Sequence, residues 1–121
     1  MIEYTVKVDS NGDKFWYLNG KLHREDGPAV EWAYGTKHWY LNGLRHREDG
    51  PAIERADGTK HWIRNGELHR EDGPAIERAD GDKFWYLNGK QMTQDEHRKA
   101  KSKTPTEIVI DGVTYTLKVK E

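Results

Sequence analysis

Short runs of aromatic and branched residues alternate with polar stretches along most of the chain, and the alternation has a constant step. The tryptophans recur every 23 residues, at Trp16, Trp39, Trp62 and Trp85. The run at residues 37–41 (KHWYL) has the composition of a β-strand. It ends in Asn-Gly, a pair suited to the positive φ angles of tight hairpin turns. A fixed period of this length predicts a repeat protein in which each unit is a small β-hairpin.

The rest of each unit contains a polar stretch and a second short strand. Residues 44–50 predict a loop, because they are polar and their Asp-Gly-Pro end cannot continue a helix. Residues 52–56 (AIERA) predict the second strand, and Asp57-Gly58 predicts the turn into the next unit. The expected fold is mainly β: a single-layer, twisted antiparallel β-meander built from 23-residue hairpin repeats, with a short C-terminal helix and β-hairpin.

The register of the strands depends on the length of the turn at residues 57–58. A two-residue turn would place Arg55 opposite Lys60, Glu54 opposite His61 and Ile53 opposite Trp62. One face would then carry the tryptophan column with Val30, Ile53 and Ile76. The opposite face would carry Tyr17, Tyr40, Ile63 and Tyr86, beside Phe15, His38, His61 and Phe84. A longer turn would change this pairing, because a slip of one residue exchanges the faces.

The two ends depart from the period, as terminal caps of a repeat array do. We expect residues 1–90 to form the array with an N-terminal capping strand, and residues 91–121 to form a C-terminal helix and hairpin cap. Thr93-x-x-Glu96 is a capping box that predicts a helix through about Ser102. Residues 107–120 predict a hairpin about Asp111-Gly112, with one apolar face formed by Ile108, Ile110, Val113, Tyr115, Leu117 and Val119.

The heptapeptide HREDGPA begins at His23, His46 and His69, next to the repeated Asn-Gly turn. This pattern resembles the MORN family of repeats over residues 12–90, and it is closer still to the HREDGPA-type MORN-like repeats of tailed bacteriophages. The resemblance implies β-hairpin units and a non-enzymatic scaffold or binding role, with no catalytic residues. Arg-Glu-Asp stands where the MORN pattern has Lys/Arg-His-Gly, which argues against the lipid binding proposed for some MORN proteins.

Charge and composition narrow the classes of partner. The formal net charge is -1, so no basic field draws in nucleic acid or anionic lipid. Glu31, Glu54 and Glu77 recur on the aromatic-rich strands and would repel phosphates, which makes nucleic-acid binding the weaker alternative. No secretory signal or membrane-spanning run is evident. We therefore expect no membrane association and a cytoplasmic location, in the bacterial host if the chain is phage-encoded.

The polar groups of the repeat suggest no catalytic or metal chemistry. Cysteine is absent, and His23, Glu25 and Asp26 are adjacent loop residues without a second histidine at helical spacing. Ser10 and Ser102 are the only serines, and no nucleophile turn surrounds them. We expect no enzyme, metal or cofactor. The structural interpretation is that Asp26, Asp49 and Asp72 cap the turn before Gly-Pro, while Arg and Glu pair across neighbouring repeats.

Protein recognition is the remaining class, and we expect a phage accessory protein that binds and modulates or inhibits a bacterial host protein, such as a defence protein. Tyr, Trp and Arg are enriched at binding hot spots, and non-consensus positions of a repeat array can carry function, although drift explains them equally well. The protein-binding candidates are Trp32, Tyr40, His61, Arg64, Arg55, Arg78, Tyr17 and Tyr86. The alternative is a self-assembling scaffold, with a homodimer through the C-terminal hairpin or a sheet edge.

Overall fold

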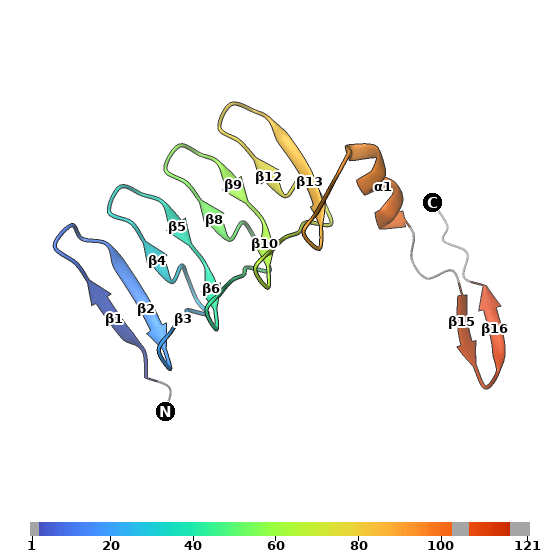
Figure 1. The fold of residues 1–121 in the computed structure, drawn as a ribbon, viewed down its shortest axis with the longest axis horizontal. Coiled ribbons are helices and arrows are strands. Elements are labelled where there is room, and N and C mark those ends of the chain that lie inside the picture. The colour runs from blue at the N-terminus through green and yellow to red at the C-terminus, as the bar shows by residue number, and fades with distance from the viewer. Residues whose placement is uncertain (1–2, 103–106, 117–121) are drawn as a thin grey trace.

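The computed structural model describes residues 3–102 and 107–116. In this part of the chain the main feature is a ten-stranded antiparallel sheet with one short helix after it. The hairpins stand side by side along the long axis of the molecule, in the order of the sequence (Figure 1). The predicted fold class, a mainly β meander of hairpin repeats with a C-terminal helix and hairpin, is confirmed.

The strands are short, and most contain only two residues. The central sheet comprises β1 (Thr5–Val8), β2 (Lys14–Leu18), β3 (Lys21–Leu22), β4 (Val30–Glu31), β5 (Lys37–His38), β8 (Ile53–Glu54), β9 (Lys60–His61), β12 (Ile76–Glu77), β13 (Lys83–Leu87) and β14 (Lys90–Met92). Three further pairs are β6 (Tyr40–Leu41) with β7 (Leu44–Arg45), β10 (Ile63–Arg64) with β11 (Glu67–Leu68), and β15 (Glu107–Ile110) with β16 (Val113–Thr116).

The Asn-Gly turns have the predicted geometry. Asn42 and Gly43 have φ angles of 51° and 81°, the positive values that a two-residue hairpin loop requires. This loop places Leu44 opposite Leu41 and Arg45 opposite Tyr40. The prediction that residues 44–50 are loop throughout is therefore wrong at its start, because the tight turn returns the chain directly into strand pairing.

The other turn is longer than predicted, and this changes the register. Ile53 pairs with His61 and Glu54 with Lys60, while the N–H of Arg55 donates to the carbonyl of Thr59 at 2.9 Å. The loop thus contains the three residues 56–58, and Asp57 Oδ1 accepts from the N–H of Thr59 at 2.8 Å. Since one added residue exchanges the faces, the branched residues after each HREDGPA loop lie on the tyrosine side and not the tryptophan side: Val30, Ile53 and Ile76.

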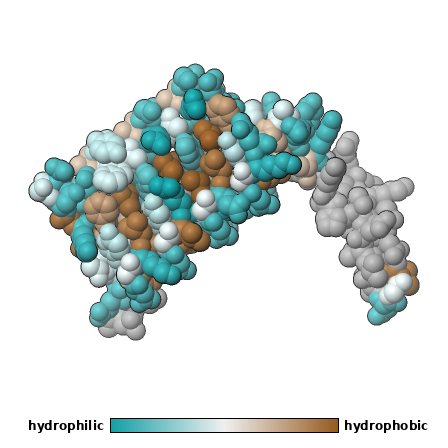
Figure 2. Space-filling model, in the orientation of Figure 1, coloured by the Kyte–Doolittle hydropathy of each residue, from teal (hydrophilic) through white to brown (hydrophobic). Residues whose placement is uncertain are grey.

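The core of this thin sheet combines a row of alanines with the branched residues Val30, Ile53 and Ile63. Ala29, Ala52 and Ala75 are fully buried, and Trp39 packs against the cluster that contains Ala52 and Ile53. The N–H of Ala52 donates to His61 and its carbonyl accepts from Trp39, at 2.8 and 2.7 Å. Figure 2 shows apolar residues along the middle of the visible side of the array, between hydrophilic rims. Burial here depends on contact between neighbouring repeats.

Histidines connect successive repeats. The Nδ1 atom of His46 accepts a hydrogen bond from the N–H of Asn65 at 2.9 Å, which fixes its ring proton on Nε2. His23 and His69 make the same bond with the N–H groups of Asn42 and Asn88. The first residue of each HREDGPA motif is therefore structural, and it anchors the loop to the turn of the next unit.

The C-terminal end is covered by helix α1 (Gln94–Ser102). The predicted capping box is confirmed: the N–H of Glu96 donates to Thr93 Oγ1 at 3.1 Å, and the N–H of Thr93 donates to the Glu96 carboxylate at 2.9 Å. His97 is buried, with Nε2 2.6 Å from the carbonyl oxygen of Arg70. The helix thus lies against the last repeat. Among the described residues, no helix is long and apolar enough to cross a membrane.

The predicted C-terminal hairpin forms, with Asp111 in the left-handed region at φ 51°. Its backbone register pairs Ile108 with Tyr115 and Ile110 with Val113. The two remaining members of the predicted apolar stripe, Leu117 and Val119, lie outside the described residues. The division of the chain at residue 90 stays a prediction.

Candidate interaction surface

The corrected register gives the sheet two chemically different faces. One face carries the tyrosine column and its neighbours, and we call it the aromatic–cationic face. Its rings are Phe15, Tyr17, Trp32, Tyr34, His38, Tyr40, His61, Phe84 and Tyr86, and its cations are Lys7, Arg45, Arg55 and Arg78. The other face, which we call the tryptophan face, carries the tryptophan column and the HREDGPA loops.

Rings support one another along the aromatic–cationic face. Trp32 meets Phe15 edge-on with ring centroids 5.5 Å apart, and it stacks with Tyr34 at 6.1 Å. His38 stacks with Tyr40 at 6.3 Å. Such pairs prefer separations of this size and hold each ring in one orientation. The face therefore presents ordered rings, although its core is thin.

The cations of this face lie over those rings. The guanidinium of Arg78 is 5.1 Å from the Phe84 ring centroid, and that of Arg45 is 5.6 Å from the Tyr40 centroid. Lys7 lies 5.1 Å from the Tyr17 centroid. Cation–π contact at these distances is modestly favourable and directs each stem along the surface. The charged heads remain available to solvent or to a partner.

The structure brings together seven of the eight predicted binding residues. Arg64 is the exception, because it follows Ile63 in β10 and so points to the tryptophan face, where it lines a groove with Trp62 and Arg70. The seven residues on the aromatic–cationic face are Trp32, Tyr40, His61, Arg55, Arg78, Tyr17 and Tyr86. Sequence reasoning missed Tyr34, which is 68% exposed. Its signal was a tyrosine at the turn position that holds Asp57 and Asp80 in later repeats.

The glutamates that argued against an anionic partner lie on the tryptophan face. Glu54 pairs with Lys37 on one side and Lys60 on the other, and Glu31 and Glu77 have the same surroundings. Among the described strand residues that the register assigns to the aromatic–cationic face, none is acidic. The strands of the two faces thus differ in charge: lysines and glutamates alternate on one face, and the strands of the other carry cations but no carboxylates.

The arginines of the HREDGPA loops tie each loop to its own repeat. The Arg47 guanidinium lies 3.9 Å from the Trp39 ring centroid and donates to Asp49, to Glu54 and to the carbonyl of Pro51. Arg24 and Arg70 stack on Trp16 and Trp62 in the same way. The predicted Arg–Glu pairs therefore form, but within one repeat and not across neighbouring repeats, because the arginine folds back over its own tryptophan.

The aspartates of the loops also have a role that differs from the predicted one. Asp26, Asp49 and Asp72 each accept a hydrogen bond from the Nε of the arginine two residues earlier. The same packing explains why the loop contains a glycine, since a Cβ at Gly50 would lie only 2.9 Å from Arg47 Cζ. The heptapeptide is thus a structural clasp in which His, Arg, Asp and Gly each have a defined contact.

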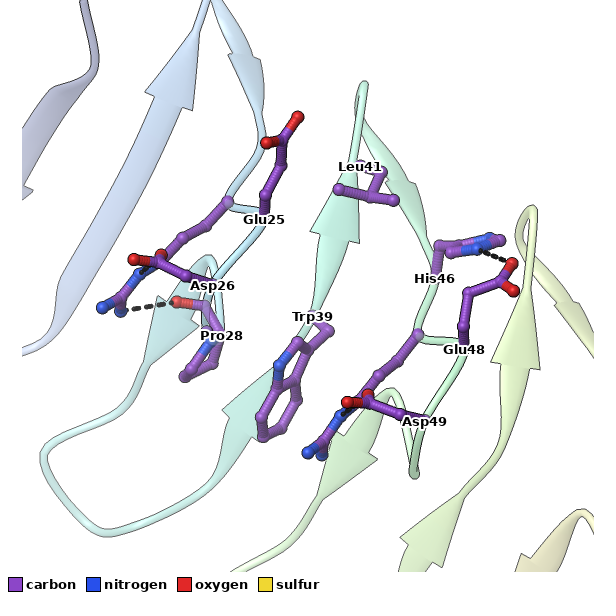
Figure 3. A pocket seen from close by; sticks show the side chains of 11 residues that line it. Glu25, Asp26, Pro28, Trp39, Leu41, His46, Glu48 and Asp49 are labelled. Carbon is purple, nitrogen blue, oxygen red and sulfur yellow. Dashed lines mark hydrogen bonds and ion pairs between the residues drawn. The ribbon is translucent and has the colours of Figure 1, made fainter.

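Open grooves separate successive loops on the tryptophan face. Figure 3 shows Trp39 between the loop that carries Glu25 and Asp26 and the loop that carries His46 and Glu48. These carboxylates stand at the rim, and their neighbours are the structural arginines. No three His, Asp or Glu side chains of the described residues are grouped to hold a metal ion. The groove offers no nucleophile with an activating base.

The histidines of the aromatic–cationic face are held neutral by their surroundings. Burial and the positive charges of Arg45 and Arg55 lower the pKa of His38 from 6.5 to about 4, and His61 contributes in the same direction. Burial and the charges of Arg55, Arg45 and Arg78 likewise lower the pKa of His61. The face therefore already carries a positive potential that resists a further positive charge.

We expect the free energy of unfolding to fall as the pH is lowered from 6.5 towards 4. In this window the unfolded chain binds protons on His38 and His61 that the folded chain does not, so acid favours unfolding. After allowance for solvent screening, the loss from His38 alone is roughly 1–2 kcal/mol, and His61 adds to it in the same direction. Urea unfolding at several pH values measures it.

The chain itself offers the matched variant for this prediction. Phe15 and Phe84 occupy the positions equivalent to His38 and His61 in the first and last repeats. The double substitution His38→Phe and His61→Phe should therefore fold and flatten the pH dependence between 6.5 and 4. An unchanged slope in this variant would show that other groups cause the acid sensitivity.

Comparisons of the chain with protein-family models, with curated proteins and with solved structures gave no match.

Proposed function

We propose that this chain is a non-catalytic repeat module that binds another protein through the aromatic–cationic face. The observation that carries the proposal is the gathering of tyrosine, tryptophan and arginine on one face, with Tyr34, Arg45 and Arg55 exposed. These are the residue types that dominate binding energy at protein interfaces. A rigid array of hairpins presents them at a regular step, which suits an extended contact with a partner surface.

The resemblance to HREDGPA-type repeats of tailed phages extends the proposal to a class of partner. A phage-encoded protein of this kind acts in the host cytoplasm, and we propose that it binds and modulates or inhibits a bacterial host protein, such as a defence protein. Binding without catalysis is sufficient for inhibition when the bound face covers a functional surface of the partner.

Affinity capture from bacterial lysate tests the proposal when it includes variants of each face. The substitutions Arg45→Ala and Arg55→Ala remove two exposed cations from the aromatic–cationic face. Arg64→Leu is the matched control on the tryptophan face, because Leu18, Leu41 and Leu87 occupy its equivalent positions. We expect one host protein to be enriched by the original chain and by Arg64→Leu, and lost by at least about tenfold in the double variant.

Two results would overturn the proposal. One is capture that is equally strong with the double variant, provided that circular dichroism shows it folded. The other is a lysate from which nothing is enriched above a tag-only control.

Self-association is the second candidate, and the open edge of β1 favours it. No strand pairs with the outer side of β1 in the described residues, and Val6 and Val8 are 46% and 59% exposed there. An unpaired edge with apolar side chains can add a strand from another copy. Light scattering that shows a monomer at high protein concentration would exclude this alternative.

A further inference from the structure

The arginines of the aromatic–cationic face make no ion pair within 4 Å among the described residues. Arg24, Arg47 and Arg70 of the tryptophan face each have carboxylate partners within 4 Å, at Asp26 and Glu31 and their equivalents. In contrast, no carboxylate of the described residues lies that close to Arg45, Arg55 or Arg78. The two sets of arginines thus differ in whether a carboxylate lies within ion-pair distance.

Three equivalent positions form a row along this face. Trp32, Arg55 and Arg78 each follow the branched residue of the second strand by two, in successive repeats. Equivalent residues of neighbouring repeats are two strands apart, which is roughly 10 Å in a β-sheet. The row therefore presents one large ring and then two guanidinium groups at a regular step.

We infer that the face recognises an acidic protein segment with an apolar residue followed by two carboxylates, all at steps of roughly 10 Å. The inference rests on the proposed function and names the chemistry of the partner. Residues seven apart on an α-helix have about this separation, since each residue rises about 1.5 Å. Charge complementarity favours such a segment, because the guanidinium groups of Arg55 and Arg78 can each bind one carboxylate with two hydrogen bonds. The rings of Trp32 and Tyr34 cover the apolar side chain of the segment.

A protein segment fits the surroundings of the row better than single-stranded nucleic acid does. Asp57 and Asp80 are exposed at the hairpin tips, two residues beyond Arg55 and Arg78. Hydrogen bonds from Thr59 and, to a smaller extent, the positive charge of Arg55 lower the pKa of Asp57. A continuous phosphate chain along the row would pass these carboxylates, whereas separate carboxylates at matching steps meet only the arginines.

Fluorescence anisotropy with labelled poly-L-glutamate as the probe tests whether the row binds carboxylates, and labelled oligo-dT is measured in parallel. Because poly-L-glutamate carries a carboxylate at every residue, this measurement tests the charge of the segment and not the spacing of its carboxylates. We expect the original chain to bind poly-L-glutamate at low salt and to release it as salt rises. The charge reversals Arg55→Glu and Arg78→Glu should weaken binding by at least about tenfold. Arg64→Leu should leave it unchanged.

A gain-of-function variant sharpens the test. Trp32→Arg installs the residue that the next two repeats carry at the same position, so the fold should accept it. The row then contains three arginines, and the affinity for poly-L-glutamate should rise by up to about fivefold, the value of one added exposed ion pair. No rise in a folded Trp32→Arg variant would contradict the assignment of this row.

The outcomes separate this inference from the proposed function. If poly-L-glutamate does not bind, or binds the charge-reversed variant equally well, the acidic chemistry is wrong. Lysate capture that still depends on Arg45 and Arg55 would then leave the protein-binding proposal standing. Tighter binding of oligo-dT than of poly-L-glutamate through Arg55 and Arg78 would overturn the inference in favour of nucleic acid.

Discussion

Substitution of Arg47 by methionine should lower the free energy of unfolding by about 2–3 kcal/mol. The Arg47 side chain is only 23% exposed, and it contacts the Trp39 ring, Asp49, Glu54 and the carbonyl of Pro51. Methionine keeps a stem of similar length over the indole ring but donates no hydrogen bond. The carbonyl of Pro51 and the half-buried Glu54 carboxylate then lose their partner, which is the larger part of the cost.

Arg98→Met is the matched control for this prediction. Arg98 pairs with Asp95 three residues earlier on α1, but its side chain is 75% exposed, and an exposed helical pair contributes at most about 0.5 kcal/mol. Urea unfolding followed by tryptophan fluorescence compares the two variants. Equal, small losses for Arg47→Met and Arg98→Met would show that the clasp adds nothing to stability beyond a surface ion pair.

The repeat was predictable from sequence because its turns are encoded locally. Asn-Gly specifies positive φ angles at both positions, and the structure gives them at Asn42 and Gly43. The start of the helix was equally predictable, since Thr93 and Glu96 form two reciprocal hydrogen bonds within four residues. The Asn-Gly turns and the start of the helix, which are set by contacts between residues close in sequence, could therefore be predicted, whereas the strands are shorter than predicted.

The register was not predicted, because it depends on which of two loops forms at residues 56–58. Asp57-Gly58 is compatible with a two-residue or a three-residue loop. The longer loop is stabilised by a contact between repeats: Thr36 Oγ1 accepts from the N–H of Ala56 at 3.0 Å, twenty residues away. Thr59 makes the same contact with Ala79. The recurrence of a buried threonine at the period was the signal that sequence reasoning left unused.

Which residues share the candidate surface depends on the register of the strands. The sequence predicted which residues were unusual, among them Trp32, Arg55 and Arg78, because each departs from or completes a periodic column. It did not predict that Glu54 faces away from them, since that depends on a shift of one residue. The argument that Glu31, Glu54 and Glu77 repel an anionic partner is therefore wrong for this face, because these glutamates lie on the other one. The formal net charge of -1, which was the second argument, is unchanged.

Substitution of Ala52 by leucine should destabilise the protein by about 3 kcal/mol. Ala52 is 0% exposed and packs with Ile53 and Ile63, with Trp39 against the same cluster. Its backbone is hydrogen-bonded on both sides, to Trp39 and His61, so the chain cannot move outward to admit a larger side chain. The added methylenes must displace the indole ring or break a strand pairing at the middle of the array.

Ala79→Leu makes the same chemical change at an exposed turn position and should alter stability by less than about 0.5 kcal/mol. Urea unfolding of the two variants distinguishes overpacking from a general effect of added hydrophobicity.

In a thin sheet the destabilisation should also extend to neighbouring repeats, because the contacts of Ala52 join two repeats and each repeat is buried only by its neighbours. A shallower unfolding transition in Ala52→Leu, with a lower midpoint, would report that loss of cooperativity. An unchanged midpoint of urea unfolding would mean that the structure accommodates a larger side chain at Ala52. The contacts between repeats would then depend on the histidines and arginines and not on the alanines.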